Sequence, residues 1–299
     1  MKKALIIALI CLAVGVVIFG IGWGLLQNNP IDKNVFKDKV YSFGTDELPS
    51  QIHIDTTNSS VEFRTTKESE WRVECMDKEK VYHRVELTDG VLTIQEIDER
   101  LWYERIGLFA NLRPQRMIVY LPEGAYGLLD ICVVSGDISL PEGFAFSGVT
   151  LKSTSGDISF AAVATGDVNI KVTSGDIAVS GQIDGALEIS GTSGDIEINN
   201  VTPTSINIQS TSGDVDMADV VCRETCTVKM VSGEVELKRC DALSFNITTT
   251  SGDIHGSILT AKTFDCKTTS GDIHIPDDGN GGTFRAKTQS GDIEITVVK

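Results

Sequence analysis

The chain has few aromatic residues, little proline and a shortage of basic side chains. Only 6% of its 299 residues are aromatic and 7 are proline, whereas 28 are glycine. Lys and Arg total 26 against 42 Asp and Glu, which gives a formal net charge of −16. This balance excludes an ordinary nucleic-acid binder, which needs a basic face to neutralise phosphates. The composition favours many short strands and tight turns, and a hydrophobic fraction of 41% is enough for a packed core.

Common catalytic signatures are also missing. The sequence contains no Gly-x-Ser-x-Gly, P-loop or His-Glu-x-x-His pattern. Sugar-degrading β-helices use aromatic platforms, but Trp23, Trp71, Trp102 and every Tyr precede the regular repeat described below. We therefore expect a protein that is not an enzyme and that needs no cofactor, with Ca²⁺ or Zn²⁺ as the ions to consider.

One long uncharged run occurs, from Ala4 to Leu26, directly after Lys2 and Lys3. As a helix it would be about 35 Å long, more than the ~30 Å hydrocarbon core of a bilayer. The alternative is a cleaved signal peptide, but the run is longer than a usual signal and residues 22–26 make a poor cleavage site. We expect residues 1–26 to be a signal anchor, with residues 4–26 in the lipid bilayer, and residues 27–40 to be a juxtamembrane linker. The two lysines predict a single-pass protein with a cytoplasmic N-terminus and an extracytoplasmic C-terminal domain.

The dominant feature is an internal repeat with a period of 19 to 20 residues. Ser-Gly-Asp-Ile or a close variant begins at Ser135, Ser155, Ser174, Ser193, Ser212, Ser232, Ser251, Ser270 and Ser290. Mostly apolar residues lie six and four positions before each Ser and three after it, with polar residues between them. This alternation predicts two short strands per repeat, and units this short must stack to bury their apolar faces. We predict an all-β fold, a parallel β-solenoid (β-helix) of 19–20-residue rungs preceded by one N-terminal transmembrane helix; an antiparallel sandwich is the alternative.

Residues 41–130 are less regular but show the same alternation at 52–55, 61–63, 91–94 and 117–121. We expect 41–130 to be an irregular N-terminal β part that caps the solenoid, and 131–299 to be its regular part. The motifs Asn58-Ser59-Ser60-Val61-Glu62, Asp89-Gly90-Val91-Leu92-Thr93-Ile94, Val119-Tyr120-Leu121-Pro122 and the repeated Ser-Gly-Asp-Ile resemble the bacterial "putative adhesin" domain family. This family of unknown function includes envelope-stress proteins of the LiaG type. The resemblance covers about residues 41–299, implies an envelope location and a binding or structural role, and transfers no catalytic residues.

The repeated turn has a structural and a metal-binding interpretation. Glycine provides a backbone conformation with positive φ, and Asp accepts hydrogen bonds from turn amides. A ladder of carboxylates about 4.8 Å apart is instead a candidate Ca²⁺ site. We favour structural turns at Gly136, Asp137, Gly156, Asp157, Gly175, Asp176, Gly194, Asp195, Gly213, Asp214, Gly233, Glu234, Gly252, Asp253, Gly271, Asp272, Gly291 and Asp292.

Two histidines form a more local candidate metal site. Asp253, His255, Asp272 and His274 occupy equivalent outward positions of consecutive repeats. Stacking would bring two imidazoles and two carboxylates into one patch that suits Zn²⁺. The alternative, which we favour, is a solvated polar ladder, because ligands on a flat face rarely complete a tetrahedron.

Two segments are candidates for partner contacts. Residues 98–115 interrupt the strand pattern with Leu101, Trp102, Tyr103, Arg105 and Phe109, and several of these types are enriched at protein interfaces. They either bind a partner or cover the end of the solenoid. Residues 292–299 end the chain in a strand pattern, which predicts an open final rung able to self-associate. Most cysteines occupy apolar positions, although a Cys222–Cys240 disulfide is compatible with an extracytoplasmic location.

Together these features predict a membrane-anchored, extracytoplasmic, adhesin-like binding or scaffold protein of the bacterial cell envelope without catalytic activity. Its partner would be an envelope protein or a cell-wall component. One alternative is an accessory regulator of envelope-stress sensing that acts through protein contacts. The other is a cation-dependent adhesive module that binds Ca²⁺ or Zn²⁺.

Overall fold

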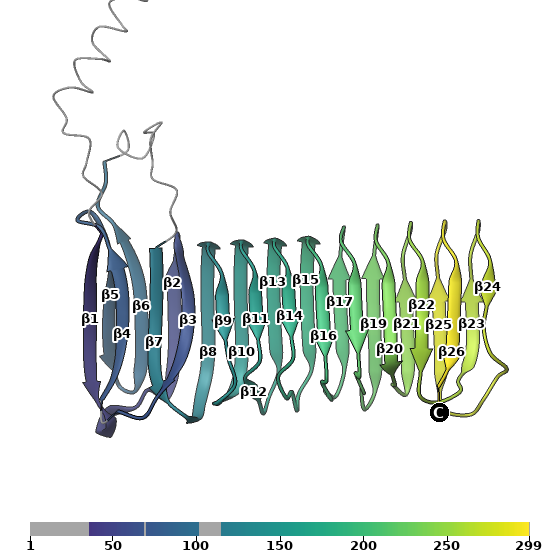
Figure 1. The fold of residues 1–299 in the computed structure, drawn as a ribbon, viewed down its shortest axis with the longest axis horizontal. Helices are drawn as coiled ribbons and strands as arrows, with labels where there is room; N and C mark the ends of the chain where they lie inside the picture. Colours follow the sequence, from purple (N-terminus) through teal and green to yellow (C-terminus); the bar gives the residue numbers. More distant parts are fainter. Residues whose placement is uncertain (1–35, 69, 102–114, 299) are drawn as a thin grey trace, which may run out of the picture.

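The chain forms a long solenoid of two facing β-sheets (Figure 1). The computed structural model describes residues 36–68, 70–101 and 115–298. Within them the one helical element is the short 3-10 helix η1 (Thr45–Glu47), and no helix is long and apolar enough to cross a membrane. The expected anchor, residues 1–26, lies outside the described residues. The all-β prediction is confirmed.

Sheet A contains thirteen strands. In spatial order they are β1 (Lys37–Gly44), β4 (Glu70–Asp77), β7 (Gln115–Pro122), β3 (Ser59–Thr66), β9 (Ile138–Leu140), β11 (Ile158–Phe160), β14 (Ile177–Val179), β16 (Ile196–Asn199), β18 (Val215–Ala218), β20 (Val235–Cys240), β22 (Ile254–Ile258), β26 (Ile293–Val297) and β24 (Ile273–His274).

Sheet B also contains thirteen strands. In spatial order they are β23 (Thr263–Lys267), β25 (Thr283–Lys287), β21 (Ser244–Thr248), β19 (Thr225–Met230), β17 (Ile206–Ser210), β15 (Leu187–Ser193), β13 (Val168–Ser174), β10 (Phe144–Ser155), β8 (Gly124–Ser135), β2 (Gln51–Thr56), β6 (Val91–Asp98) and β5 (Val81–Thr88), and the short β12 (Val163–Ala164) pairs with β10.

The repeat produces this architecture because equivalent residues of successive rungs stack in parallel register. Ser155 pairs with both Ser135 and Ser174, so the repeat serines form one column. The apolar positions before and after them point between the sheets: Leu129, Val149, Ile170 and Ile208 are all at most 3% exposed. A single continuous core therefore runs along the whole length of the solenoid.

The N-terminal end departs from the parallel pattern. β2 and β3 pair in parallel with the regular rungs, whereas β1 and β4 add antiparallel strands to sheet A and β5 adds one to sheet B. Residues 37–40, expected in the linker, belong to β1. The linker prediction was wrong there because β1 pairs along its full length with β4. These antiparallel strands form the first layer of the solenoid.

The C-terminal end has an unexpected rung order. The last strands, β25 and β26, lie between the rung β21–β22 and the rung β23–β24, although β23 and β24 come earlier in the chain (Figure 1). The prediction that residues 292–299 form the open final rung was therefore wrong. The physical reason is strand length: β26 pairs with all five residues of β22, whereas β24 ends before Pro276, which has no amide hydrogen for the ladder. The exposed end is β23–β24, where Ile273 and Ile275 are each 39% exposed.

Candidate functional site

The glycine of each repeated turn is required by both conformation and space. Gly175 has φ of +142°, and a Cβ atom there would lie 2.3 Å from the carbonyl oxygen of Gly156 in the preceding rung. The same close approach recurs at Gly194 and Gly213, each with positive φ. An L-residue would be strained at these positions and would push the rungs apart.

The turn carboxylates form a hydrogen-bonded ladder between rungs. The amide of Asp157 donates to Oδ1 of Asp137 at 3.0 Å, and the amide of Asp176 donates to Oδ1 of Asp157 at 2.8 Å. The ladder begins at Ser60, whose hydroxyl accepts from the amide of Asp137. Equivalent bonds join Asp195, Asp214 and Glu234, and then Asp253, Asp292 and Asp272 in that spatial order. Because one oxygen of most of these carboxylates already binds a backbone amide, the geometry favours the structural interpretation over a Ca²⁺ ladder.

The candidate metal site of Asp253, His255, Asp272 and His274 does not assemble. β26 lies between β22 and β24, so Glu294 is in register with both histidines and separates them. His255 instead pairs with Glu234, 2.7 Å from its Nδ1, and lies 3.8 Å from Glu236. Asp253 and Asp272 are likewise separated, by Asp292, within the turn ladder. The prediction was wrong because it assumed that rungs stack in chain order.

The remaining sequence candidates contribute little to a site. Leu101 is described and exposed, while Trp102, Tyr103, Arg105 and Phe109 lie outside the described residues. The six described cysteines all carry free thiols, so the structure contains no Cys222–Cys240 disulfide. These two residues are buried in the core together with Cys226.

The outer face of sheet A carries a column of mainly acidic residues. In the regular rungs it includes Glu197, Asp216, Glu236, His255 and Glu294, in consecutive register. Partial burial and the neighbouring charge of Glu236 raise the pKa of Asp216. The pKa of Glu236 is lowered, chiefly by a hydrogen bond from Lys238 at 2.7 Å.

The outer face of sheet B carries a column of lysines instead. They occur at Lys152, Lys171, Lys229, Lys287 and Lys267, all exposed, with Ser190, Gln209 and Thr248 at the intervening rungs. Among the five, and within the described part of the chain, only Lys267 has a carboxylate within ion-pair distance, that of Asp265 at 3.0 Å. The two faces of a strongly acidic chain therefore differ in charge.

A shallow groove of about 400 Å³ lies on sheet B beside the first two of these lysines. Its lining includes Lys152, Lys171, Ser153, Thr154, Thr173 and Thr192. The hydroxyl of Ser153 is buried and has no hydrogen-bond partner among the described residues. The groove thus offers two unpaired ammonium groups and threonine side chains to a polar ligand, whereas the Ser153 hydroxyl lies beneath its floor.

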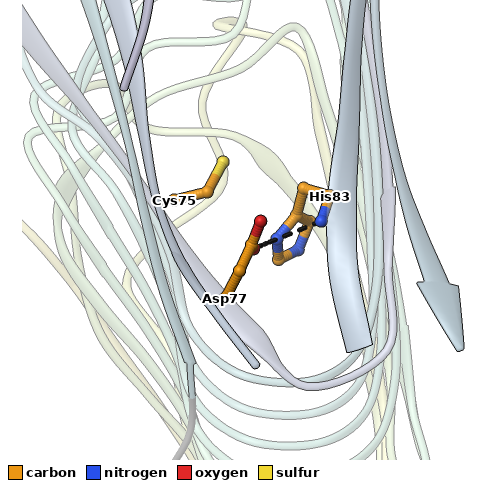
Figure 2. Close-up of side chains that lie close together, drawn as sticks. All are labelled: Cys75, Asp77 and His83. Atoms are coloured by element: carbon orange, nitrogen blue, oxygen red, sulfur yellow. Dashed lines mark hydrogen bonds and ion pairs between the residues drawn. The ribbon is translucent and has the colours of Figure 1, made fainter. Parts of the chain in front are cut away.

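A second candidate is buried in the N-terminal cap, where Cys75, Asp77 and His83 meet between the sheets (Figure 2). Alternation along β4 turns Cys75 and Asp77 inward, and β5 turns His83 inward from the other sheet. One potential ligand atom from each residue lies within 4.8 Å of the others, and each residue is at most 2% exposed. Burial, with the adjacent charge of Asp77, raises the pKa of the Cys75 thiol.

Sequence reasoning missed this cluster. The inward positions of β4 read Trp71, Val73, Cys75 and Asp77, so a charged residue ends an otherwise apolar buried series. A carboxylate at such a position needs a partner. That signal points to Asp77, but only the fold shows that His83 faces it.

Comparison with known proteins gives one family match. The sequence model of the family described as Toastrack DUF4097 matches residues 50–257 and, in a second match, residues 224–299. A search of curated proteins finds no match.

Several solved structures align with most of this chain. A structure from Bacteroides fragilis NCTC 9343, named a "putative adhesin", is 12% identical, covers 88% of this chain and 99% of its own, and gives a TM-score of 0.44. A "putative lipid binding protein" from Parabacteroides distasonis ATCC 8503 is 17% identical, with coverages of 87% and 97% and a TM-score of 0.44. A "putative adhesin" from the same organism is 15% identical, with coverages of 88% and 98% and a TM-score of 0.39.

Proposed function

The chain belongs to the Toastrack DUF4097 family, and from this premise we propose that it is a non-catalytic, adhesin-like binding scaffold of the bacterial cell envelope. In this proposal residues 4–26 anchor it in the membrane and the solenoid extends on the extracytoplasmic side. The sheet B face, with its groove and lysine column, binds an extended anionic polymer of the envelope. The observation that carries the binding role is the column of five lysines on sheet B, four of them without a carboxylate within ion-pair distance among the described residues, in a chain whose net charge is −16.

The arrangement of these charges favours a linear ligand. Lys152 and Lys171 lie in adjacent rungs, so their Cα atoms follow the solenoid axis at about 4.8 Å. A chain of phosphate or carboxylate groups running along the axis meets one ammonium group after another. A planar membrane would also approach the carboxylates of the turn ladder, such as Asp157 and Asp176, and would be repelled by them.

Binding of long-chain inorganic polyphosphate to the full-length protein tests this proposal. We expect wild-type protein to bind this probe with an affinity that falls as salt concentration rises, because exposed charges are screened. Lys152→Ala/Lys171→Ala should weaken binding about tenfold, equivalent to about 0.7 kcal/mol for each lost charge contact. The matched control is Arg223→Ala/Lys238→Ala, which removes two exposed basic groups away from the groove and should leave binding nearly unchanged.

Three outcomes would overturn the assignment. Wild-type protein that does not bind polyphosphate has no polyanion site. An equal loss in both double variants would show that only net charge matters. Binding to phosphatidylglycerol vesicles but not to polyphosphate would make a lipid surface the partner.

A separate experiment tests the location. A reporter that is active only outside the cytoplasm, fused after Lys299, should be active when residues 1–26 are present. Activity of a cytoplasmic reporter alone would reverse the proposed topology. Fractionation should find the fusion in the membrane, and replacement of residues 1–26 by a cleavable signal peptide should release it.

A further inference from the structure

The Cys75–Asp77–His83 cluster has a buried carboxylate oxygen that accepts no hydrogen bond from the described residues. Oδ1 of Asp77 lies 2.7 Å from Nδ1 of His83 and accepts from the His83 backbone amide at 3.2 Å. Oδ2 is buried and has no hydrogen-bond partner among the described residues; the Lys39 ammonium lies 3.7 Å away. An unsatisfied carboxylate oxygen in an apolar interior is costly unless a cation binds it.

The surrounding hydroxyl groups determine which nitrogen of His83 carries a hydrogen. Thr56 Oγ1 donates its hydrogen to Glu96 at 2.8 Å, whereas Ser59 Oγ lies 3.5 Å from Oε1 of Gln115. Both hydroxyls also lie near Nε2 of His83, at 3.2 and 3.1 Å. Because the Thr56 hydrogen is used in the bond to the Glu96 carboxylate, Thr56 Oγ1 accepts from Nε2, and this nitrogen carries a hydrogen.

Glu96 fixes this arrangement in place. Its Oε2 atom accepts from Thr56 Oγ1 and from the backbone amides of Thr57 and Asn58. The Nε2 side of His83 therefore lies against a preorganised network, and the Nδ1 side faces Asp77 and Cys75 (Figure 2). Metal-binding histidines commonly show this pattern, in which one nitrogen donates to an oxygen partner and the other binds the ion.

We propose that Cys75 Sγ, the Asp77 carboxylate and His83 Nδ1 bind a Zn²⁺-class divalent cation, with a fourth position open to water. Sulfur, nitrogen and carboxylate oxygen are the donors that Zn²⁺ takes in proteins. The cation replaces the hydrogen between Nδ1 and Asp77 and provides Oδ2 with a partner. It also displaces the thiol proton of Cys75, because metal binding ionises a coordinating thiol.

The proposed metal site would stabilise the N-terminal cap by linking its two sheets. Cys75 and Asp77 belong to sheet A and His83 to sheet B, so a shared cation ties the two sheets beside the β4–β5 turn. This turn is otherwise closed by a backbone bond from the Lys78 amide to the Val81 carbonyl at 2.8 Å. The proposed role is structural and is independent of the polymer-binding face on sheet B.

The hydrogen bonds around His83 exclude a catalytic triad made of the same residues. Ser59, His83 and Asp77 lie in the order of a Ser-His-Asp triad, but Ser59 is fully buried. Nε2 of His83 donates its hydrogen to Thr56 Oγ1 and cannot take one from the Ser59 hydroxyl. His83 therefore cannot act as a general base for Ser59.

Cobalt titration of the full-length protein, after removal of bound metal with a chelator, tests the proposal. Co²⁺ reports its ligands, because a bound thiolate gives a charge-transfer absorption band. We expect one Co²⁺ per chain, a thiolate band, and displacement by Zn²⁺ that raises the unfolding temperature. Cys75→Ser should remove the band. Cys226→Ser, which changes an equally buried cysteine outside the cluster, should retain it, as should His255→Ala/His274→Ala.

The wild-type measurement decides the question even if a variant folds poorly. Absence of a thiolate band in wild-type protein would overturn the proposal. A band that persists in Cys75→Ser, or that disappears in Cys226→Ser or in His255→Ala/His274→Ala, would place the metal elsewhere and would overturn it too. His83→Gln retains Cys75 and should lose both the tight Co²⁺ site and the Zn²⁺-dependent rise in unfolding temperature.

Discussion

The ammonium group of Lys262 is buried 2.5 Å from Oδ1 of Asp241, although the two residues belong to successive repeats. The same nitrogen donates to the Thr260 hydroxyl and to the Gly281 carbonyl, each at 2.6 Å. All three hydrogens of the ammonium group therefore have an acceptor. Since Gly281 lies just before β25 begins at Thr283, this contact holds the chain where it returns from β24 to insert β25 and β26.

Replacing Lys262 should destabilise the C-terminal rungs. Lys262→Met keeps the length of the side chain but leaves the Asp241 carboxylate without its cation, which should lower the free energy of unfolding by about 3 kcal/mol. Urea unfolding of the full-length protein measures this. Lys267→Met is the control, because Lys267 is exposed and pairs only with the exposed Asp265, and its effect should stay within about 0.5 kcal/mol. Equal effects of the two changes would mean that the buried contact does not hold the rung.

The turn glycines should tolerate no side chain, whereas a glycine within a strand should. Gly175→Ala places a methyl group 2.3 Å from the Gly156 carbonyl oxygen at φ of +142°, and we expect a loss of about 2 kcal/mol or more. In Gly191→Ala the nearest atom is the Ser210 hydroxyl, 3.5 Å away, so the change should be neutral or slightly stabilising. Thermal unfolding distinguishes the two. A neutral Gly175→Ala would show that the rungs can separate locally without cost.

The repeat predicted the core well because a period of two assigns each residue to one side of a strand. Ile208 and Gln209 are adjacent, and the first is fully buried while the second is exposed, as the alternation requires. The repeat also predicted the register of the strands, because equivalent turns of neighbouring rungs stack on one another. The Ser135–Ser155–Ser174 column is the direct result.

Rung order and the buried cluster could not be predicted in the same way. Residues 263–275 and 283–295 have nearly the same pattern, so either segment fits next to β21 and β22. The choice depends on Pro276 and on the Lys262 contact, which are local details outside the repeat. His83 meets Asp77 only because the chain crosses from one sheet to the other after β4, and no spacing rule encodes that crossing.

The acidic column on sheet A should make stability depend on pH through Asp216. Its pKa is raised by partial burial and by the adjacent Glu236, so the folded state disfavours the ionised carboxylate. The resulting penalty is absent well below the ordinary Asp pKa of about 3.9 and is complete once the pH exceeds the raised folded pKa. Asp216→Asn removes this penalty and should raise the unfolding midpoint at pH 7. The gain should shrink as the pH falls towards 3, where Asp216 is protonated in both states.

Glu188→Gln removes an equal charge from the opposite sheet and is the control for net charge. The same pH-dependent gain in both variants would assign the effect to the overall negative charge of the chain rather than to the Asp216–Glu236 pair.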